Sequence, residues 1–219
     1  MGRDMPAASL LSNERWDSLD RLIKRVDLDR WLSSRYAPPA ARRALVALYA
    51  LNYELVRVRG AVSEPALGAI RYQWWRDALE ELAAGTPPRR HDVALAAAEL
   101  IQAGHHTAEG LLRLVDGHED AFECADRSRE PEATLMMMAA RILAPAHGWG
   151  PNIQELAPAF AAARRGPTKA YGPVVPTVPG PIRPAIAHAC LREPYARGRE
   201  PGELGRRIRV FRAMVTGRV

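Results

Sequence analysis

The sequence lacks any long apolar run, and this absence limits where the chain can lie. No stretch of about 18 or more consecutive apolar residues occurs, so no transmembrane helix is predicted. Residues 1–11 show no cationic region followed by an apolar stretch, and we read no secretory signal there. A cytoplasmic location is therefore expected, with peripheral contact with the inner membrane left open.

Cysteine and lysine are also scarce. Cys124 and Cys190 lie far apart and have no CxxC partner, which argues against a disulfide framework and against a zinc site. Lys24 and Lys169 are the only lysines, so nearly all of the positive charge behind the net +6 is arginine. Arginine suits bidentate recognition of phosphate and carboxylate. The high alanine content nevertheless favours a simpler explanation, a bias toward GC-rich codons.

Several common catalytic and binding motifs are missing. The histidines show no HExxH or comparable spacing, so no metal site is predicted. The sequence has no Gly-x-Ser-x-Gly nucleophile elbow and no glycine-rich phosphate loop after a strand. The positive charge would permit nucleic-acid binding, but no helix-turn-helix, zinc-finger or RNA-binding signature is present. No nucleic-acid partner is expected.

The chain does contain helix-favouring sequence, rich in alanine, leucine and arginine. Spacing of apolar residues, caps and prolines predict helices over about 13–35, 39–59, 63–84, 91–103, 107–125, 131–146, 153–165, 182–197 and 201–217. Asn13 and Ser63 are the expected N-caps of the first and third helices. Glycine and proline concentrate in 148–183, where 166–181 is expected to be an extended or loose loop. Without repeats, we expect one helical domain over 1–219.

The stretch 27–82 carries the most specific pattern. It holds an Asp-x-Asp-Arg start with APPAARRAL, then ALYALNYEL, then SEPALGAIRYQWWRDAL. These pieces, about a quarter of the chain, resemble the squalene/phytoene synthase family. The resemblance implies an all-α, isoprenoid-synthase-like helical bundle. Similarity is weaker over 114–123 and 184–217, and the short chain leaves a truncation of the scaffold around 148–183 open.

Active members of this family condense two isoprenoid diphosphates, and Mg²⁺ helps the diphosphate to leave. Two Asp-rich motifs on facing helices supply the carboxylate oxygens that Mg²⁺ prefers. Here the first motif would follow Tyr49, but Val56, Arg57 and Gly60 occupy the positions of its acids. Glu54 is the only carboxylate nearby, and the late chain has no second motif. These departures from the family's Asp-rich motifs imply no catalytic residue, no metal site and no cofactor.

A branch of the family without the aspartate pair is more similar. It has ALYA-x-N-x-E and the Gln-Trp-Trp-Arg helix, and it includes complex I assembly factors of mitochondria and their bacterial relatives. Asn52, Glu54 and the segments 63–65 and 71–77 fit this branch. The resemblance therefore implies a catalytically degenerate protein, an assembly or partner-binding factor of the respiratory complex I type. Whether it keeps a prenyl or lipid cavity is left open.

Two alternatives remain at this point. One is an active Mg²⁺-dependent prenyl-diphosphate condensing transferase with unusual ligands, namely Glu54, Asp116 and Asp120. The last two share a helix face, for which a solvated acidic surface is the ordinary interpretation. The other is a scaffold remnant without function. Mg²⁺ is expected only for the transferase.

Adjacent tryptophans point to a surface for a ligand or a partner. Trp74 and Trp75 cannot face the same side of a helix, so one is expected in the core and the other at a cavity or interface. The candidate surface comprises Tyr49, Asn52, Glu54, Arg71, Trp74, Trp75 and Arg76. A protein partner is expected there, with an isoprenoid or lipid ligand as a further option.

The C-terminal helix is basic and amphipathic. Leu204, Ile208, Phe211 and Val215 form one apolar stripe. Arginines occupy most of the remaining circumference, at Arg206, Arg207, Arg209 and Arg212. This pattern is typical of a last bundle helix that packs its stripe on the core and turns its arginines outward. It also suits a helix on an anionic membrane surface or against a partner.

Overall fold

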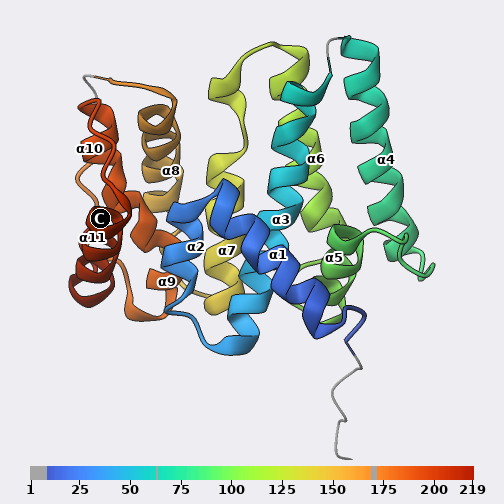
Figure 1. Ribbon diagram of the computed structural model, residues 1–219, viewed down its shortest axis with the longest axis horizontal. Coiled ribbons are helices and arrows are strands. Elements are labelled where there is room, and N and C mark those ends of the chain that lie inside the picture. Colours follow the sequence, from blue (N-terminus) through green and yellow to red (C-terminus); the bar gives the residue numbers. More distant parts are fainter. Residues whose placement is uncertain (1–8, 63, 169–171) are drawn as a thin grey trace, which may run out of the picture.

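The computed structural model describes residues 9–62, 64–168 and 172–219 (Figure 1). The fold of this part of the chain is a bundle of helices joined by loops. The α-helices are α1 (Asn13–Val26), α2 (Leu28–Ser34), α3 (Pro39–Ala61), α4 (Pro65–Ala83), α5 (Asp92–Gln102), α6 (Ala108–Glu123), α7 (Glu132–Leu143), α8 (Gly150–Arg165), α9 (Arg183–Ile186), α10 (Arg192–Ala196) and α11 (Glu203–Thr216). Short 3₁₀ turns are η1 (Arg127–Arg129), η2 (Gly180–Ile182) and η3 (Ala187–Leu191). The all-α class predicted from the sequence is confirmed.

Helix α3 lies at the centre of the bundle. Its residues from Ala44 to Leu51 are all buried, without interruption by a polar face. A helix that is apolar all round needs neighbours on every side. Helices α1, α4, α5, α6 and α7 supply them. The polar residues that do occur on α3, after Leu51, therefore stand out against this background.

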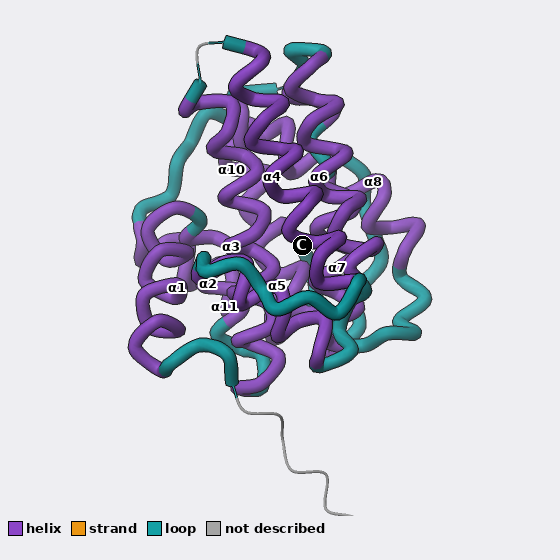
Figure 2. Tube along the Cα trace, turned by 90° about the vertical axis from the view of Figure 1, so that its right-hand side faces the viewer, coloured by secondary structure: helices purple, strands orange, loops and turns teal. Residues whose placement is uncertain are grey.

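The bundle has two ends, which lie on either side of α3. Helices α4 and α6 form one end, whereas α8, α10 and α11 form the other (Figure 1). In the view turned by 90°, α4 and α6 run side by side (Figure 2). They approach closely at Gly68, where an added Cβ would lie 2.3 Å from a ring carbon of Phe122. No helix in the described part of the chain is both long enough and apolar enough to cross a membrane.

The helix predicted over 13–35 is two helices. The chain breaks at Asp27, which has φ −145° and ψ 69° and whose side chain caps α2 by accepting from the amide of Arg30. An aspartate cap satisfies a free amide and so begins a new helix in a new direction. The cap of α1 is Ser12 rather than Asn13, because the Ser12 hydroxyl accepts from the amide of Arg15.

The prediction of one continuous helix over 182–197 is also wrong. The chain there forms α9, η3 and α10 in succession, each at most five residues long. Pro184 and Pro194 lack the amide hydrogen that a continuous helix would need. Within 166–181, the described residues form no helix before η2, as predicted, but α8 begins at Gly150, earlier than 153. The predicted cap Ser63 lies outside the described residues.

Helix α11 faces the opposite way from the ordinary expectation for a last bundle helix. Val210 and Ala213 are its buried residues. The apolar stripe lies at the surface instead: Leu204 is 71% exposed, Ile208 58%, Phe211 56% and Val215 61%. Polar anchors help to hold the inner side, because Arg183 donates to the carbonyl oxygens of Met214 and Val215, at 3.0 Å each. The expectation that the stripe packs on the core is therefore wrong.

Candidate functional site

A pocket of about 200 Å³ opens on the polar face of α3. Tyr49, Asn52 and Val56 line it from α3, at the three- and four-residue spacing that places side chains on one helix face. Helices α2, α6, α7 and α8 and the link after α1 close the other sides. Of its fifteen lining residues, seven are charged, so the pocket presents a polar interior at the centre of an otherwise apolar bundle.

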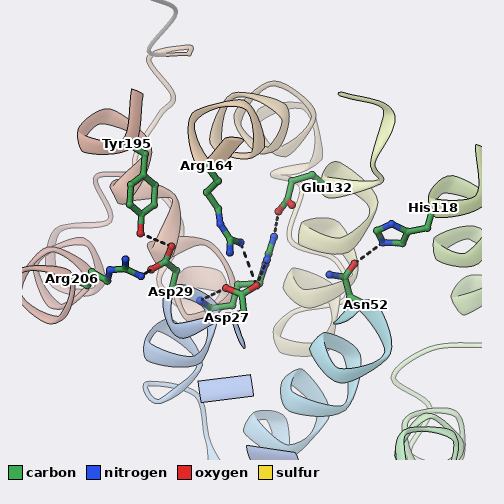
Figure 3. A network of polar contacts seen from close by, with 9 residues as sticks. Asp27, Asp29, Asn52, His118, Glu132, Arg164, Tyr195 and Arg206 are labelled. Atoms are coloured by element: carbon green, nitrogen blue, oxygen red, sulfur yellow. Dashed lines mark hydrogen bonds and ion pairs between the residues drawn. The ribbon is translucent and has the colours of Figure 1, made fainter. Parts of the chain in front are cut away.

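A buried ion-pair network forms one wall of the pocket. The guanidinium of Arg30 donates to the carboxylates of Asp27 and Glu132, although residues 30 and 132 are far apart in the sequence. Arg164 of α8 adds a contact to Asp27 at 3.4 Å (Figure 3). Burial raises the pKa of Asp27, but the charges of Arg164 and Arg30 outweigh it and hold that pKa well below its usual range.

The network continues behind Asp27 toward the C-terminal helices. Asp29 is 2% exposed and accepts hydrogen bonds from the hydroxyl of Tyr195 at 2.8 Å and from Arg206 at 3.0 Å (Figure 3). Burial raises the pKa of Asp29 above its ordinary value despite these partners. The Asp-x-Asp-Arg segment thus ties α2 to α7 and α8 on one side and to α10 and α11 on the other.

Asn52 and His118 meet across the pocket from α3 and α6. The Nε2 atom of His118 lies 2.9 Å from Oδ1 of Asn52, which requires the tautomer that carries its hydrogen on Nε2 (Figure 3). Burial, with the charges of Arg59 and Arg30, lowers the pKa of His118 to about 3, so this ring is neutral. The hydroxyl of Tyr49 is buried and has no hydrogen-bond partner within the described residues.

Of the three positions where the family motif would carry acids, only that of Val56 lies at this pocket. Val56 lines it and is 36% exposed. Arg57 points elsewhere and forms an ion pair with Glu54 at 3.1 Å. At Gly60 an added Cβ would meet nothing within 4 Å.

The carboxylates that do line the pocket already have partners. Asp27 pairs with Arg30 and Arg164, and Glu132 pairs with Arg30. The third, Glu130, lies 3.0 Å from Arg127. A carboxylate that pairs with a guanidinium shares its lone pairs with that cation, and a Mg²⁺ ion bound to it would lie next to a positive charge that repels it.

A second hollow lies on another face of α3. A hollow there of about 200 Å³ is lined by Glu54, Arg57, Arg71, Trp74 and Trp75, among others. Trp75 is buried at 5% exposure and Trp74 is 36% exposed, with their rings in T-shaped contact at 4.8 Å. The predicted set of surface residues is thus divided. Tyr49 and Asn52 line the central pocket, whereas the outer hollow is lined by Glu54, Arg71, Trp74 and Trp75.

Arg76 belongs to neither site. It forms ion pairs with Asp116 at 2.8 Å and Glu119 at 2.7 Å, joining α4 to α6. Asp120 in turn pairs with Arg129 at 2.7 Å. Across the described ranges, no three His, Cys, Asp or Glu side chains form a group that could hold a metal ion. The structure therefore does not assemble Glu54, Asp116 and Asp120 into a ligand set.

The sequence reasoning missed the buried network. The Asp-x-Asp-Arg start enters the sequence analysis only as part of the family resemblance, and Glu132 and Arg164 are not predicted there. Arg206, expected to face outward with the other arginines of its helix, instead turns inward and pairs with Asp29. One signal was available: buried aspartates need buried cations, and the arginine-rich helices at 150–165 and 203–216 are where these cations lie.

Comparison with known proteins places most of the pocket lining within a recognised segment. The family model described as squalene/phytoene synthase matches residues 23–144. Curated relatives are described as NADH dehydrogenase (ubiquinone) complex I, assembly factor 6. The protein of Rattus norvegicus is 34% identical over 98 residues, which is 45% of this chain and 29% of the relative. The Homo sapiens protein is 31% identical over the same shares of both chains.

The match to the Bos taurus protein is longer but less similar, with 28% identity over 119 residues, 54% of this chain and 35% of the relative. The matches thus span about a third of the length of the curated relatives. No solved structure matches the chain. The network wall formed by α8 and α11 lies outside the segment that the family model covers.

Proposed function

The chain belongs to the squalene/phytoene synthase family, and from that premise we propose that it is a non-catalytic member that assists assembly of respiratory complex I by binding a protein partner. The assembly role is supported by the description of the relatives, which name an assembly factor of complex I. The absence of prenyl transfer is supported by the pocket itself.

The observation that carries the proposal is the state of the pocket carboxylates. Val56 stands where an acid of the family motif would reach the pocket, and Asp27, Glu130 and Glu132 are all paired with arginines. Arg30 is 4% exposed and holds both Asp27 and Glu132, so drawing either carboxylate away to a metal would weaken a buried ion-pair network, at a cost of several kcal/mol. The proposal therefore includes no metal cofactor.

The charged lining also bears on the ligand. An isoprenoid tail is bound through apolar contact, whereas seven of the fifteen residues that line the pocket are charged. A polar group, such as the head of a lipid, suits this lining better than a prenyl chain does. The description of the relatives names a ubiquinone-linked complex. Ubiquinone is a lipid-soluble quinone, so a complex that uses it works at a membrane. The proposal therefore includes peripheral contact with the inner membrane from the cytoplasmic side.

We place the partner surface on α4. Leu67, Ile70 and Trp74 follow one another at three- and four-residue spacing and are 46%, 64% and 36% exposed. Arg71 is exposed beside them. A row of apolar side chains flanked by a cation fits an amphipathic protein segment that carries carboxylates.

The test is deletion of the gene in its source organism, with complex I measured on native gels. Loss of assembled complex, restored by the wild-type chain, is the expected result. Ile70→Ser should restore it poorly, whereas Val174→Ser, a matched change at a fully exposed site (101%) outside α4, should restore it fully. Normal complex I in the deletion strain would overturn the assembly role, and equal rescue by both variants would overturn the α4 surface.

A further inference from the structure

The exposed stripe of α11 is more extensive than one helix alone would provide. Its four large apolar side chains lie in a single row on the outer face, and each is more than half exposed. Tyr36, from the connection between α2 and α3, is 44% exposed and its ring lies 6.5 Å from that of Phe211. A tyrosine at this place adds an apolar ring with a polar tip, the combination favoured where an apolar phase meets water.

Arginines border the stripe symmetrically. At about 100° per residue, Arg207 lies roughly 70° to one side of the centre of the stripe and Arg212 roughly 70° to the other. Both are exposed, as is Arg209 farther round the helix. Arg207 is paired with Glu203, the one acidic residue of α11. Arg209 and Arg212 form no ion pair with a carboxylate in the described part of the chain.

From this arrangement we propose that α11 is a docking surface for an anionic lipid membrane, on which the helix lies parallel to the surface. Apolar side chains would enter the boundary between head groups and acyl chains, while the arginines on both flanks extend their aliphatic stems and reach lipid phosphates. The inner face of the helix need not detach, because Arg206 pairs with Asp29 and because Arg183 of α9 donates to the carbonyl oxygens of Met214 and Val215 at the C-terminal end of α11.

Charge decides against a second copy of this chain as the occupant. Two α11 stripes packed face to face would bring the flanking arginines of both copies together, and the one glutamate of each helix already has a partner. A planar anionic membrane would instead attract the arginines on both flanks of the stripe at once. The surface lies at the end of the bundle remote from α4 (Figure 1), so lipid and protein partner could be bound together. The inference names the surface for the membrane contact proposed above and rests on that contact, but it does not depend on the assembly role.

The experiment is vesicle sedimentation of the purified chain. Vesicles of phosphatidylcholine alone are compared with vesicles that also contain phosphatidylglycerol, at low and at high salt. We expect binding to the anionic vesicles that weakens as salt rises. Ile208→Ser combined with Phe211→Ser should weaken binding by at least about tenfold. Arg212→Gln should weaken it about fivefold.

The control is Val174→Ser, which removes a fully exposed apolar side chain (101%) outside α11 and should leave vesicle binding unchanged. Circular dichroism verifies that each variant keeps its helices, which is expected since the replaced side chains are exposed. Absence of binding to anionic vesicles, equal binding to neutral ones, or unaltered binding by the α11 variants would overturn the proposal. So would a dimer of the free chain that Phe211→Ser dissociates, because the stripe would then be an interface between copies.

Discussion

Arg30 provides the sharpest test of the buried network. Its side chain is 4% exposed, and it joins Asp27 and Glu132, which are 15% and 14% exposed. Arg30→Met keeps a similar length and removes the charge, so that Asp27 retains only the longer contact to Arg164 and Glu132 loses its partner. Removing one member of a buried ion pair typically costs about 3–5 kcal/mol, because the remaining charge stays buried without compensation.

Thermal and urea unfolding followed by circular dichroism measure this cost. For a chain of this size, about 1 kcal/mol corresponds to a shift of roughly 2–4 °C in Tm, so Tm should fall by about 6–20 °C. The loss should depend on pH. Since the pKa of Asp27 is depressed in the folded wild type, its stabilising contribution is complete above the unfolded value and is lost as pH falls through the folded value. The gap between wild type and variant should therefore be widest near neutral pH and narrow below about pH 4.

The control for this prediction is Arg15→Met, which removes an exposed pair with Asp92 at 3.2 Å, with side chains 56% and 43% exposed. Pairs of this kind contribute about 1 kcal/mol or less. If Arg30→Met lowers the free energy of unfolding no more than Arg15→Met does, the network does not carry the stability that its burial implies, and the reasoning is refuted.

Two further predictions concern packing and protonation. Gly68→Ala should lower the free energy of unfolding by about 1–3 kcal/mol, because its Cβ would lie 2.3 Å from Phe122. Gly60→Ala, with nothing within 4 Å of the added Cβ, should raise the free energy of unfolding by up to about 1 kcal/mol. Urea midpoints of the two variants that shift in the same direction would contradict this. Burial and nearby arginines lower the pKa of His118 to about 3, so stability should decline as pH falls below about 6.5, the unfolded value, toward 3. Proton NMR of the ring should show no titration between about pH 8 and 5, and a midpoint near the unfolded value would show that the ring is not buried.

Most of the helices could be predicted because their signals are local. Spacing of apolar residues and the prolines at 38, 39 and 65 locate α3 and α4 closely. The break at Asp27 was missed because its flanking residues continue the apolar spacing, and only the cap geometry reveals a new helix. The interruption at 183–196 was missed for a related reason, since prolines can also be tolerated in the first turn of a helix.

The central pocket was only half predictable. The sequence placed Tyr49 and Asn52 on one face of one helix, and the pocket contains both. Its other walls come from pairs such as Arg30 with Glu132 and Asp29 with Arg206, which are separated by 102 and 177 residues. Local periodicity carries no information about which helices become neighbours over such distances.

The orientation of α11 could not be predicted for the same reason, because it depends on which elements become its neighbours. Periodicity identifies the stripe of Leu204, Ile208, Phe211 and Val215 but does not say whether it meets the core. In the structure a narrower face with Val210 and Ala213 packs inward, and the anchors from Arg183 and Arg206 compensate for the small apolar contact. A hydrophobic stripe predicts burial against something, and that partner need not belong to the same chain.

Prenyl transfer by the purified chain decides whether the protein is catalytic. Farnesyl and geranylgeranyl diphosphate are supplied with Mg²⁺, and products are analysed on the same sample used for calorimetric binding. We expect no condensed product with either substrate, because Val56, Arg57 and Gly60 supply no acid and the pocket carboxylates are held by arginines. A Mg²⁺-dependent product that disappears when Glu54, Asp116 and Asp120 are replaced by alanine would contradict it and establish an active transferase.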